Sequence, residues 1–179
     1  MISPFVREAR DAATSTSPTT TEFSTRRRGL RSPVSYWRGA ASPVDQSATV
    51  TVTAESDVAN ARQLGREISA RAGFTGGDQT VIAAAITEVA RNIVSYAGKG
   101  EITLTAEAEG SQPGIVVVAR DAGPGIPDVS SALREGFSTA GGAGLGLAGV
   151  RRLMDVFEIV SAPGKGTTIT MQKWRRAQA

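Results

Sequence analysis

The sequence predicts an α+β fold, a two-layer sandwich in which helices cover one face of a mixed β-sheet. The first observation is that segments with helical spacing and segments with strand alternation both occur along the chain. The second is their order, because two helices follow the first strand and two strands follow the second helix, without regular alternation. The third is a glycine-rich stretch, residues 121–146, which fits neither period and interrupts the ordered elements.

The folded part is expected to begin near residue 47. Residues 48–53 (ATVTVT) alternate apolar and polar side chains, as a half-buried strand does. A helix is then predicted through residues 58–73, with Ser56 or Asp57 as its N-cap and Gly73 at its end. Its apolar residues recur at helical spacing: Val58, Ala61, Leu64, Ile68 and Ala72.

A second helix follows the turn TGGD and carries two different rows of side chains. Glu88 and Asn92 lie one turn apart and form a polar row. A glycine in the sequence YAGKG is expected to end the helix. The other row is apolar and should be buried against the sheet: Ile82, Ala85 or Ile86, Val89 and Ile93.

The remaining elements are predicted from the same two periods. Residues 101–108 (EITLTAEA) alternate as a strand with Ile102, Leu104 and Ala106 inward, and residues 114–121 (GIVVVARD) form a continuous apolar run typical of a central strand. After the glycine-rich stretch, a helix and two strands complete the chain: LGLAGVRRLMD with Leu147, Val150 and Met154 buried, VFEIVS, and GTTITMQKW.

Composition excludes several kinds of chemistry. The chain has no cysteine and no histidine, so disulfides, thiolate metal sites, cysteine nucleophiles and a phospho-histidine relay within it are excluded. Acid–base chemistry must use carboxylates, lysine or tyrosine. No apolar run approaches the roughly 20 residues that span a bilayer, and the N-terminus lacks the apolar core of a secretory signal. We therefore expect a cytoplasmic protein with no membrane partner.

The first 46 residues differ in composition from the rest. They are rich in Ser, Thr, Pro and Arg without an apolar period, so we expect a disordered tail (1–46) before a domain at 47–175. A dispensable extension, a wrongly chosen start codon and a regulatory arm remain open for this tail. It holds most of the charge imbalance, with seven arginines against four acidic residues, whereas the rest carries thirteen basic and thirteen acidic groups. A neutral body does not support a nucleic-acid-binding domain.

Four short motifs carry the candidate chemistry. Asp121, at the end of the central strand, can accept a hydrogen bond from an adenine amino group, or can merely cap a turn. Gly123 and Gly125 would let the backbone approach a flat base, because no Cβ intervenes. The motifs follow one another at separations of roughly 33, 23 and 23 residues: EVARN, DAGPGIP, GGAGLGLAG and GKGTTIT.

Phosphates and a metal ion would need the other motifs. Gly144 and Gly146 lie where a loop becomes a helix, so backbone N–H groups there could receive phosphate oxygens, although a plain turn is the alternative. The segment 136–146 has the flexibility of a lid. The amide of Asn92 suffices to hold a magnesium ion bound to a triphosphate, and Glu88 could act as a general base; a solvated helix face is the alternative for this pair.

Taken together, the four motifs resemble the GHKL ATPases, the family of gyrase, histidine kinases and MutL, which share the Bergerat nucleotide-binding fold. The resemblance implies that Glu88 and Asn92 belong to its first box, with Asp121, Gly123 and Gly125 in the second. Gly144 and Gly146 match the third box, and Thr167 matches a threonine that helps to hold adenine through water.

Residues 48–174 resemble, more narrowly, the RsbT-type serine/threonine kinases, switch proteins of bacterial stress signalling. That resemblance implies ATP and Mg²⁺ as cofactors, a STAS-domain protein as substrate and a PP2C-type phosphatase as a possible second partner. Asn92 would hold the metal, Asp121 would read adenine and Glu88 would accept or orient the hydroxyl proton, whereas the roles of Arg91 and Lys99 stay open. An anti-sigma factor with kinase activity and a non-catalytic nucleotide-binding module are the alternatives.

Overall fold

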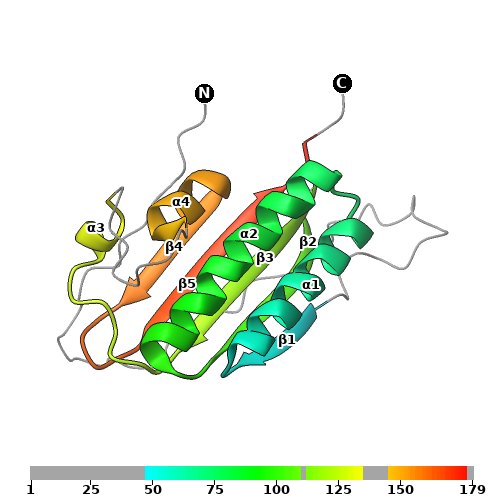
Figure 1. Cartoon of the computed structure of the whole chain (residues 1–179). Helices are drawn as coiled ribbons and strands as arrows, with labels where there is room; N and C mark the ends of the chain where they lie inside the picture. The colour runs from blue at the N-terminus through cyan, green and yellow to red at the C-terminus, as the bar shows by residue number, and fades with distance from the viewer. Residues whose placement is uncertain (1–46, 110–111, 135–144, 177–179) are drawn as a thin grey trace, which may run out of the picture.

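The structure, a computed structural model, describes residues 47–109, 112–134 and 145–176. The predicted tail (1–46) lies outside the described residues, as does most of the predicted lid, including Gly144. Figure 1 shows the described part, with the chain coloured from the first strand to the last. Within that part, no helix combines the length and the apolar character that crossing a bilayer requires.

Five strands form one sheet in the order β1-β2-β3-β5-β4. Every adjacent pair is antiparallel, so the expectation of a mixed sheet is wrong. The reason is topological: β3 and β4 run in the same direction, but β5 lies between them and opposes both. The strands are β1 (Ser47–Val52), β2 (Gly100–Glu109), β3 (Gln112–Asp121), β4 (Val156–Ser161) and β5 (Thr167–Trp174).

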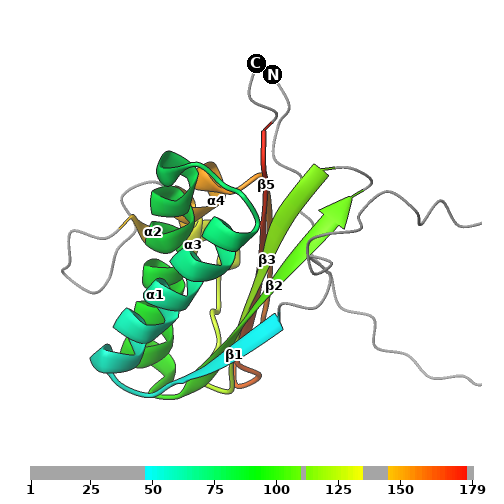
Figure 2. The same cartoon turned by 90° about the vertical axis from the view of Figure 1, so that its right-hand side faces the viewer.

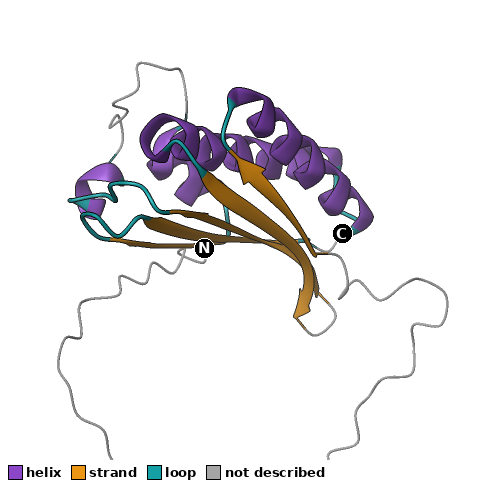
Figure 3. Ribbon diagram, turned by 90° about the horizontal axis from the view of Figure 1, so that it is seen from below, coloured by secondary structure: helices purple, strands orange, loops and turns teal. Residues whose placement is uncertain are grey.

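The helices form a second layer on one face of the sheet, which confirms the predicted α+β sandwich. Figure 2 shows α1 and α2 packed side by side over this face, and Figure 3 shows the two layers from below. Helix α2 lies between α1 and α4 and contacts both (Figure 1). The helices are α1 (Glu55–Arg71), α2 (Gly76–Asn92), the short α3 (Val129–Ala132), which the sequence did not predict, and α4 (Gly146–Leu153).

The core lies between the two layers and contains the predicted apolar rows. The predicted stripe, which runs along α2 from Ile82 and ends at Ile93 just beyond this helix, is almost fully buried. It packs on the inward side chains of the sheet, of which Ile102, Leu104 and Val117 have no exposed surface. Each such aliphatic side chain contributes about 1.5–3 kcal/mol by leaving water. The core therefore fixes the orientation of α2, and with it the polar row on the adjoining face.

The first helix begins at Glu55, and its N-cap lies two residues before Ser56, the earlier of the two predicted caps. Ala54 is the N-cap, and Asp57, at the third helical position, accepts hydrogen bonds from the backbone N–H groups of Thr53 (2.9 Å) and Ala54 (3.0 Å) and from the Thr53 hydroxyl (2.9 Å). These bonds hold the pKa of Asp57 below its ordinary value, with the Thr53 backbone bond as the largest cause. The helix ends as predicted, with Gly73 at φ 79° just beyond it.

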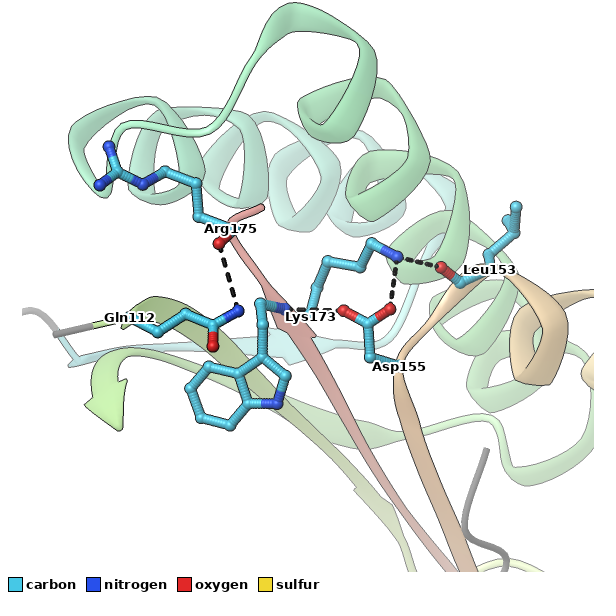
Figure 4. Close-up of polar contacts among 6 residues, drawn as sticks. Gln112, Leu153, Asp155, Lys173 and Arg175 are labelled. Atoms are coloured by element: carbon cyan, nitrogen blue, oxygen red, sulfur yellow. Dashed lines mark hydrogen bonds and ion pairs between the residues drawn. The ribbon is translucent and has the colours of Figure 1, made fainter. Parts of the chain in front are cut away.

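An ion pair fastens the C-terminal end of α4 to the last strand (Figure 4). The side chain of Lys173 is nearly buried, with 7% of the residue exposed, and its ammonium lies 2.9 Å from Asp155 Oδ1 and donates to the Leu153 carbonyl at 2.9 Å. The other oxygen of Asp155 accepts the backbone N–H of Trp174. The Lys173 ammonium thereby also interacts favourably with a carbonyl at the negative end of the helix.

Candidate functional site

The ends of four neighbouring strands form a row in which β3 and β5 bring together residues from the second and fourth predicted motifs. Asp121 is the last residue of β3 and stands directly opposite Thr167, the first residue of β5. On the other side, Asp121 pairs with Gly100 at the start of β2, and Thr167 pairs with Ser161 at the end of β4. Residues that are 46 positions apart in the chain, Asp121 and Thr167, are thus neighbours in one row across the sheet.

The Asp121 carboxylate is held by its Oδ1 atom. That atom accepts the backbone N–H of Gly123 at 2.8 Å and that of Thr167 at 3.2 Å. The first bond caps the turn after the strand, so this alternative role is present in the structure. Among the described residues, Oδ2 makes no hydrogen bond, and the residue is only half-buried. The geometry therefore combines an oriented carboxylate with a free acceptor oxygen.

Sequence reasoning missed Ser161, which joins the loop after β3 to the turn between β4 and β5. Its hydroxyl accepts the Ile126 N–H at 2.8 Å, donates to the Gly166 carbonyl at 2.9 Å and is 3.0 Å from the Thr167 hydroxyl. A single serine at a strand end carries no motif, so the sequence offered no signal for it. The register of β4 on β5 sets Ser161 against Gly166 and Thr167, and its contact with Ile126, 35 positions away, is not local in the sequence.

The two glycines of the second motif are required by contacts within the chain itself. Gly125 has φ 71°, and a Cβ there would lie 2.0 Å from the Ala162 carbonyl oxygen. At Gly123, a Cβ would lie 2.6 Å from the Cβ of Ala97, at the end of the second helical segment. These contacts give a reason for both glycines that does not depend on a bound base. The close approach to a base that the sequence suggested stays a prediction.

Asn92 ends the α-helical part of its segment. A turn of π-helix, η2 (Ile93–Ala97), follows, in which the Gly98 N–H donates to the Ile93 carbonyl at 2.8 Å. Gly98 then ends the helix with φ 72°, as the sequence predicts. Such π-helical turns occur frequently at functional sites. The Asn92 side chain is partly exposed and forms no hydrogen bond with the described residues, so its amide oxygen fits the role of a metal ligand.

Glu88 links the first motif to the third. Its Oε2 atom accepts the backbone N–H of Leu145 at 3.1 Å, immediately before α4. Gly146, the first residue of that helix, has φ 63°. A carboxylate at the positive end of a helix is electrostatically favourable, and phosphate oxygens would be favoured there for the same reason. Gly144, the other glycine predicted in this place, lies outside the described residues.

The two basic residues with open roles occupy different environments. Arg91 Nε lies 3.3 Å from Glu55 Oε1, in the first turn of α1, and both side chains are more than half exposed. This pair faces α1, whereas Glu88 reaches α4 on the other side of the helix (Figure 1). Lys99 is exposed and makes no ion pair with the described residues. The geometry separates Arg91 from the motif that would receive phosphates.

No group of three or more acidic, histidine or cysteine side chains that could hold a metal ion occurs in the ranges that the structure describes. A metal cage made by protein ligands alone is therefore not part of the described site. A single amide such as Asn92, completed by phosphate oxygens and water, remains the arrangement that the sequence predicts.

Comparison with known proteins identifies the family. The profile described as "Histidine kinase-like ATPase domain" matches residues 50–173. The chain is 48% identical over 132 residues to "Serine/threonine-protein kinase RsbT" of Bacillus subtilis (strain 168), an alignment that covers 74% of this chain and 98% of that protein. It is also 35% identical over 99 residues to "Anti-sigma F factor" of Thermoanaerobacter sp. (strain X514), covering 52% of this chain and 68% of the factor.

A similar anti-sigma F factor from Caldanaerobacter subterraneus is 33% identical over 97 residues. The kinase relative supports protein kinase activity, the enzyme class that the sequence predicts, and the family implies the use of ATP. The five-stranded sheet with its helical layer and the motifs at Glu88, Asp121 and Thr167 agree with that assignment. The chain belongs to the histidine kinase-like ATPase family.

Proposed function

We propose that this chain is a cytoplasmic, ATP- and magnesium-dependent kinase that phosphorylates a Ser or Thr of a STAS-domain partner. After release from that partner it would bind and activate a PP2C-type phosphatase. The identity to the RsbT kinase supports this proposal, because the alignment covers nearly the whole of that protein.

The observation that carries the proposal is the environment of Asp121. Its Oδ1 atom is occupied by two backbone N–H groups, which orient the carboxylate, while its Oδ2 atom has no partner among the described residues. A carboxylate held in this way accepts a hydrogen bond from an adenine amino group without offering a competing donor. Thr167, opposite Asp121 in the sheet, places a hydroxyl beside that contact.

The phosphates would extend from there toward the start of α4. The contact of Glu88 with Leu145 joins the first motif to the third, and Gly123 of the second motif packs against Ala97, five positions after Asn92. Asn92 would hold the magnesium ion, which when bound neutralises charge on the phosphates and orients them. Backbone N–H groups near Gly146 would bind phosphate oxygens, together with the glycine-rich segment that precedes it.

Glu88 would handle the proton of the acceptor hydroxyl. One of its oxygens accepts the Leu145 N–H, which fixes the carboxylate in place. The other oxygen makes no hydrogen bond in the described part of the chain and would accept or orient the proton as the hydroxyl attacks. The same side chain would thus position the start of α4 and serve the chemistry.

The test uses two substitutions of the same residue. Glu88→Gln keeps an amide oxygen for the Leu145 N–H but cannot accept a proton, whereas Glu88→Ala loses both functions. Both variants should retain ATP binding in calorimetry, and both should lose about 10²- to 10⁴-fold in phosphotransfer to a STAS partner. Arg91→Ala, on the side of the helix that faces α1, is the matched control and should transfer phosphate normally. Unchanged transfer by Glu88→Gln would remove the proton-handling role.

A substitution at Asp121 tests the nucleotide site separately. Asp121→Asn can turn an N–H group toward the adenine amino group, so ATP affinity should fall. Calorimetry at one pH and salt concentration measures this directly. An affinity equal to that of the unmodified chain would contradict the adenine assignment.

An anti-sigma factor with kinase activity is the second candidate, favoured by the similarity to the anti-sigma F factors. Pull-down with RNA polymerase sigma subunits discriminates, since a switch kinase should instead retrieve scaffold and phosphatase proteins. In a third reading, the domain only binds nucleotide and changes conformation. Radiolabelled ATP incubated with a STAS partner decides that point, because a binding module transfers no label.

A further inference from the structure

We propose that Ser161 is a positioning residue that determines base specificity. By fixing the direction of the Thr167 hydroxyl, it would make the strand-end site, formed by Asp121 and Thr167, select a purine with an amino group at position 6. A purine with an oxo group at that position would be disfavoured. The inference rests on the proposed function, in which Asp121 and Thr167 face the base. Ser161 itself acts through Thr167.

The direction of each hydrogen bond around Ser161 follows from its partners. A hydroxyl has one hydrogen to donate and two lone pairs to accept with. The Ile126 N–H can only donate, so it occupies one lone pair of Ser161 (2.8 Å). The Gly166 carbonyl can only accept, so it takes the single hydrogen of Ser161 (2.9 Å). The remaining contact, with the Thr167 hydroxyl at 3.0 Å, must therefore have Thr167 as its donor.

This direction determines what Thr167 offers to a ligand. Its hydroxyl hydrogen is directed to Ser161, and its backbone N–H donates to Asp121 Oδ1 at 3.2 Å. Toward the ligand, the side chain therefore presents lone pairs only. Asp121 Oδ2 is likewise an acceptor. In the proposed function both acceptors face the base, and neither side chain has a hydrogen left to donate.

Such a site favours a donor on the base. The 6-amino group of adenine supplies N–H groups, whereas a 6-oxo purine would place its own acceptor against acceptors. A bridging water keeps the same preference, because a water that donates to both Asp121 Oδ2 and Thr167 has only lone pairs left for the base. A mismatched polar contact of this kind costs on the order of a tenfold to a hundredfold in affinity.

Loss of the Ser161 hydroxyl should release this constraint. In Ser161→Ala, the Thr167 hydroxyl can rotate and donate to a 6-oxo group, so discrimination between the two bases should fall. In Ser161→Thr, a hydroxyl is available for the same three partners, and a β-branched side chain is suited to a strand. The conservative variant should therefore restore discrimination.

The experiment measures the dissociation constants of the whole chain for ATP and for inosine triphosphate, which differ at position 6 of the base. The unmodified chain should prefer ATP by at least about tenfold. Ser161→Ala should lower that ratio at least fivefold, and Ser161→Thr should return it toward the original value. Ser69→Ala is the matched control, since its hydroxyl is buried in α1 and bonds the Arg66 carbonyl; it should leave the ratio unchanged.

If Ser161 had a purely structural role, Ser161→Ala would lower the affinity for both nucleotides equally. The ratio of the two dissociation constants would then be unchanged, and this would overturn the inference. ATP binding would still uphold the kinase proposal. Absence of binding of either nucleotide by the unmodified chain would overturn both. If Ser161→Ala does not fold, Ser161→Cys takes its place, because a thiol of similar shape hydrogen-bonds weakly. A ratio equal to that of the unmodified chain in Ser161→Cys would likewise overturn the assignment.

Discussion

Replacement of Gly125 by alanine tests whether the loop after β3 must lie against the turn between β4 and β5. The added Cβ would lie 2.0 Å from the Ala162 carbonyl oxygen, where ordinary contact begins at 3.4 Å. Backbone cannot yield as a flexible side chain would, so the loop and the turn must separate. Gly164→Ala is the matched control, because Gly164 has nearly the same φ, 70° against 71°, and no neighbour within 4 Å of an added Cβ.

The expected cost follows from the contacts that would be lost. A positive φ costs a residue with a Cβ about 1–2 kcal/mol, and both variants share this term. Separation of the loop from the turn in Gly125→Ala also stretches the Gly164 N–H bond to the Pro124 carbonyl (2.7 Å) and the Ile126 N–H bond to Ser161 (2.8 Å). Each is worth about 0.5–1.5 kcal/mol, so Gly125→Ala should cost about 2–5 kcal/mol.

Urea denaturation followed by far-UV circular dichroism gives the free energy of unfolding of both variants, and calorimetry gives their affinity for ATP. Gly125→Ala should lower both quantities, because the displaced loop carries Asp121 at its start. Gly164→Ala should lower stability only, by the shared term. Equal losses of stability in the two variants would refute the claim that Gly125 is needed for close backbone packing.

Four further substitutions test other parts of the fold by urea denaturation. Asp155→Ala should lower the free energy of unfolding by about 3 kcal/mol, because it leaves the ammonium of Lys173 buried without its ion-pair partner. Lys173→Met should lower it less, because the remaining carboxylate is 29% exposed and can be hydrated. The reverse order of the two losses would contradict the assigned burial. The pKa of Asp57 is lowered in the folded state, so its carboxylate stabilises the fold above the pKa of the unfolded state, and this stabilisation is lost as pH falls through the pKa of the folded state. The difference in free energy of unfolding between the unmodified chain and Asp57→Asn should therefore shrink below about pH 4. Arg91→Ala breaks an exposed pair with Glu55 and should change stability by less than about 1 kcal/mol, a limit that a larger loss would disprove.

The parts of the fold that were predictable are those encoded by a local period. The stripe on α2 and the inward residues of β2 were read from spacing alone, because burial follows the helix and strand periods directly. The central position of β3 followed from its continuous apolar run. Gly98 and Gly73 ended their helices as predicted, since a left-handed residue there favours glycine.

The parts that were missed depend on contacts between distant segments. Insertion of β5 between β3 and β4 makes the sheet antiparallel, and no local signal encodes a strand order. Ser161 contacts Ile126, 35 positions away, and this contact has no local signal in the sequence. The approach of a base to Gly125 stays a prediction, and the packing of Gly125 against Ala162 could not be inferred from the motif. The N-cap fell on Ala54, because Asp57 caps from inside the first turn.

The attachment of Lys173 to Asp155 and to the Leu153 carbonyl has a mechanical consequence for α4. The C-terminal end of this helix is attached to the sheet by these bonds. At its N-terminal end, among the described residues, the Leu145 N–H donates to Glu88. Helix α4 has eight residues and is therefore about 12 Å long at the helical rise per residue. Loss of the hydrogen bond to Glu88 would let α4 tilt about its attached C-terminal end. The resulting displacement would be largest at Leu145.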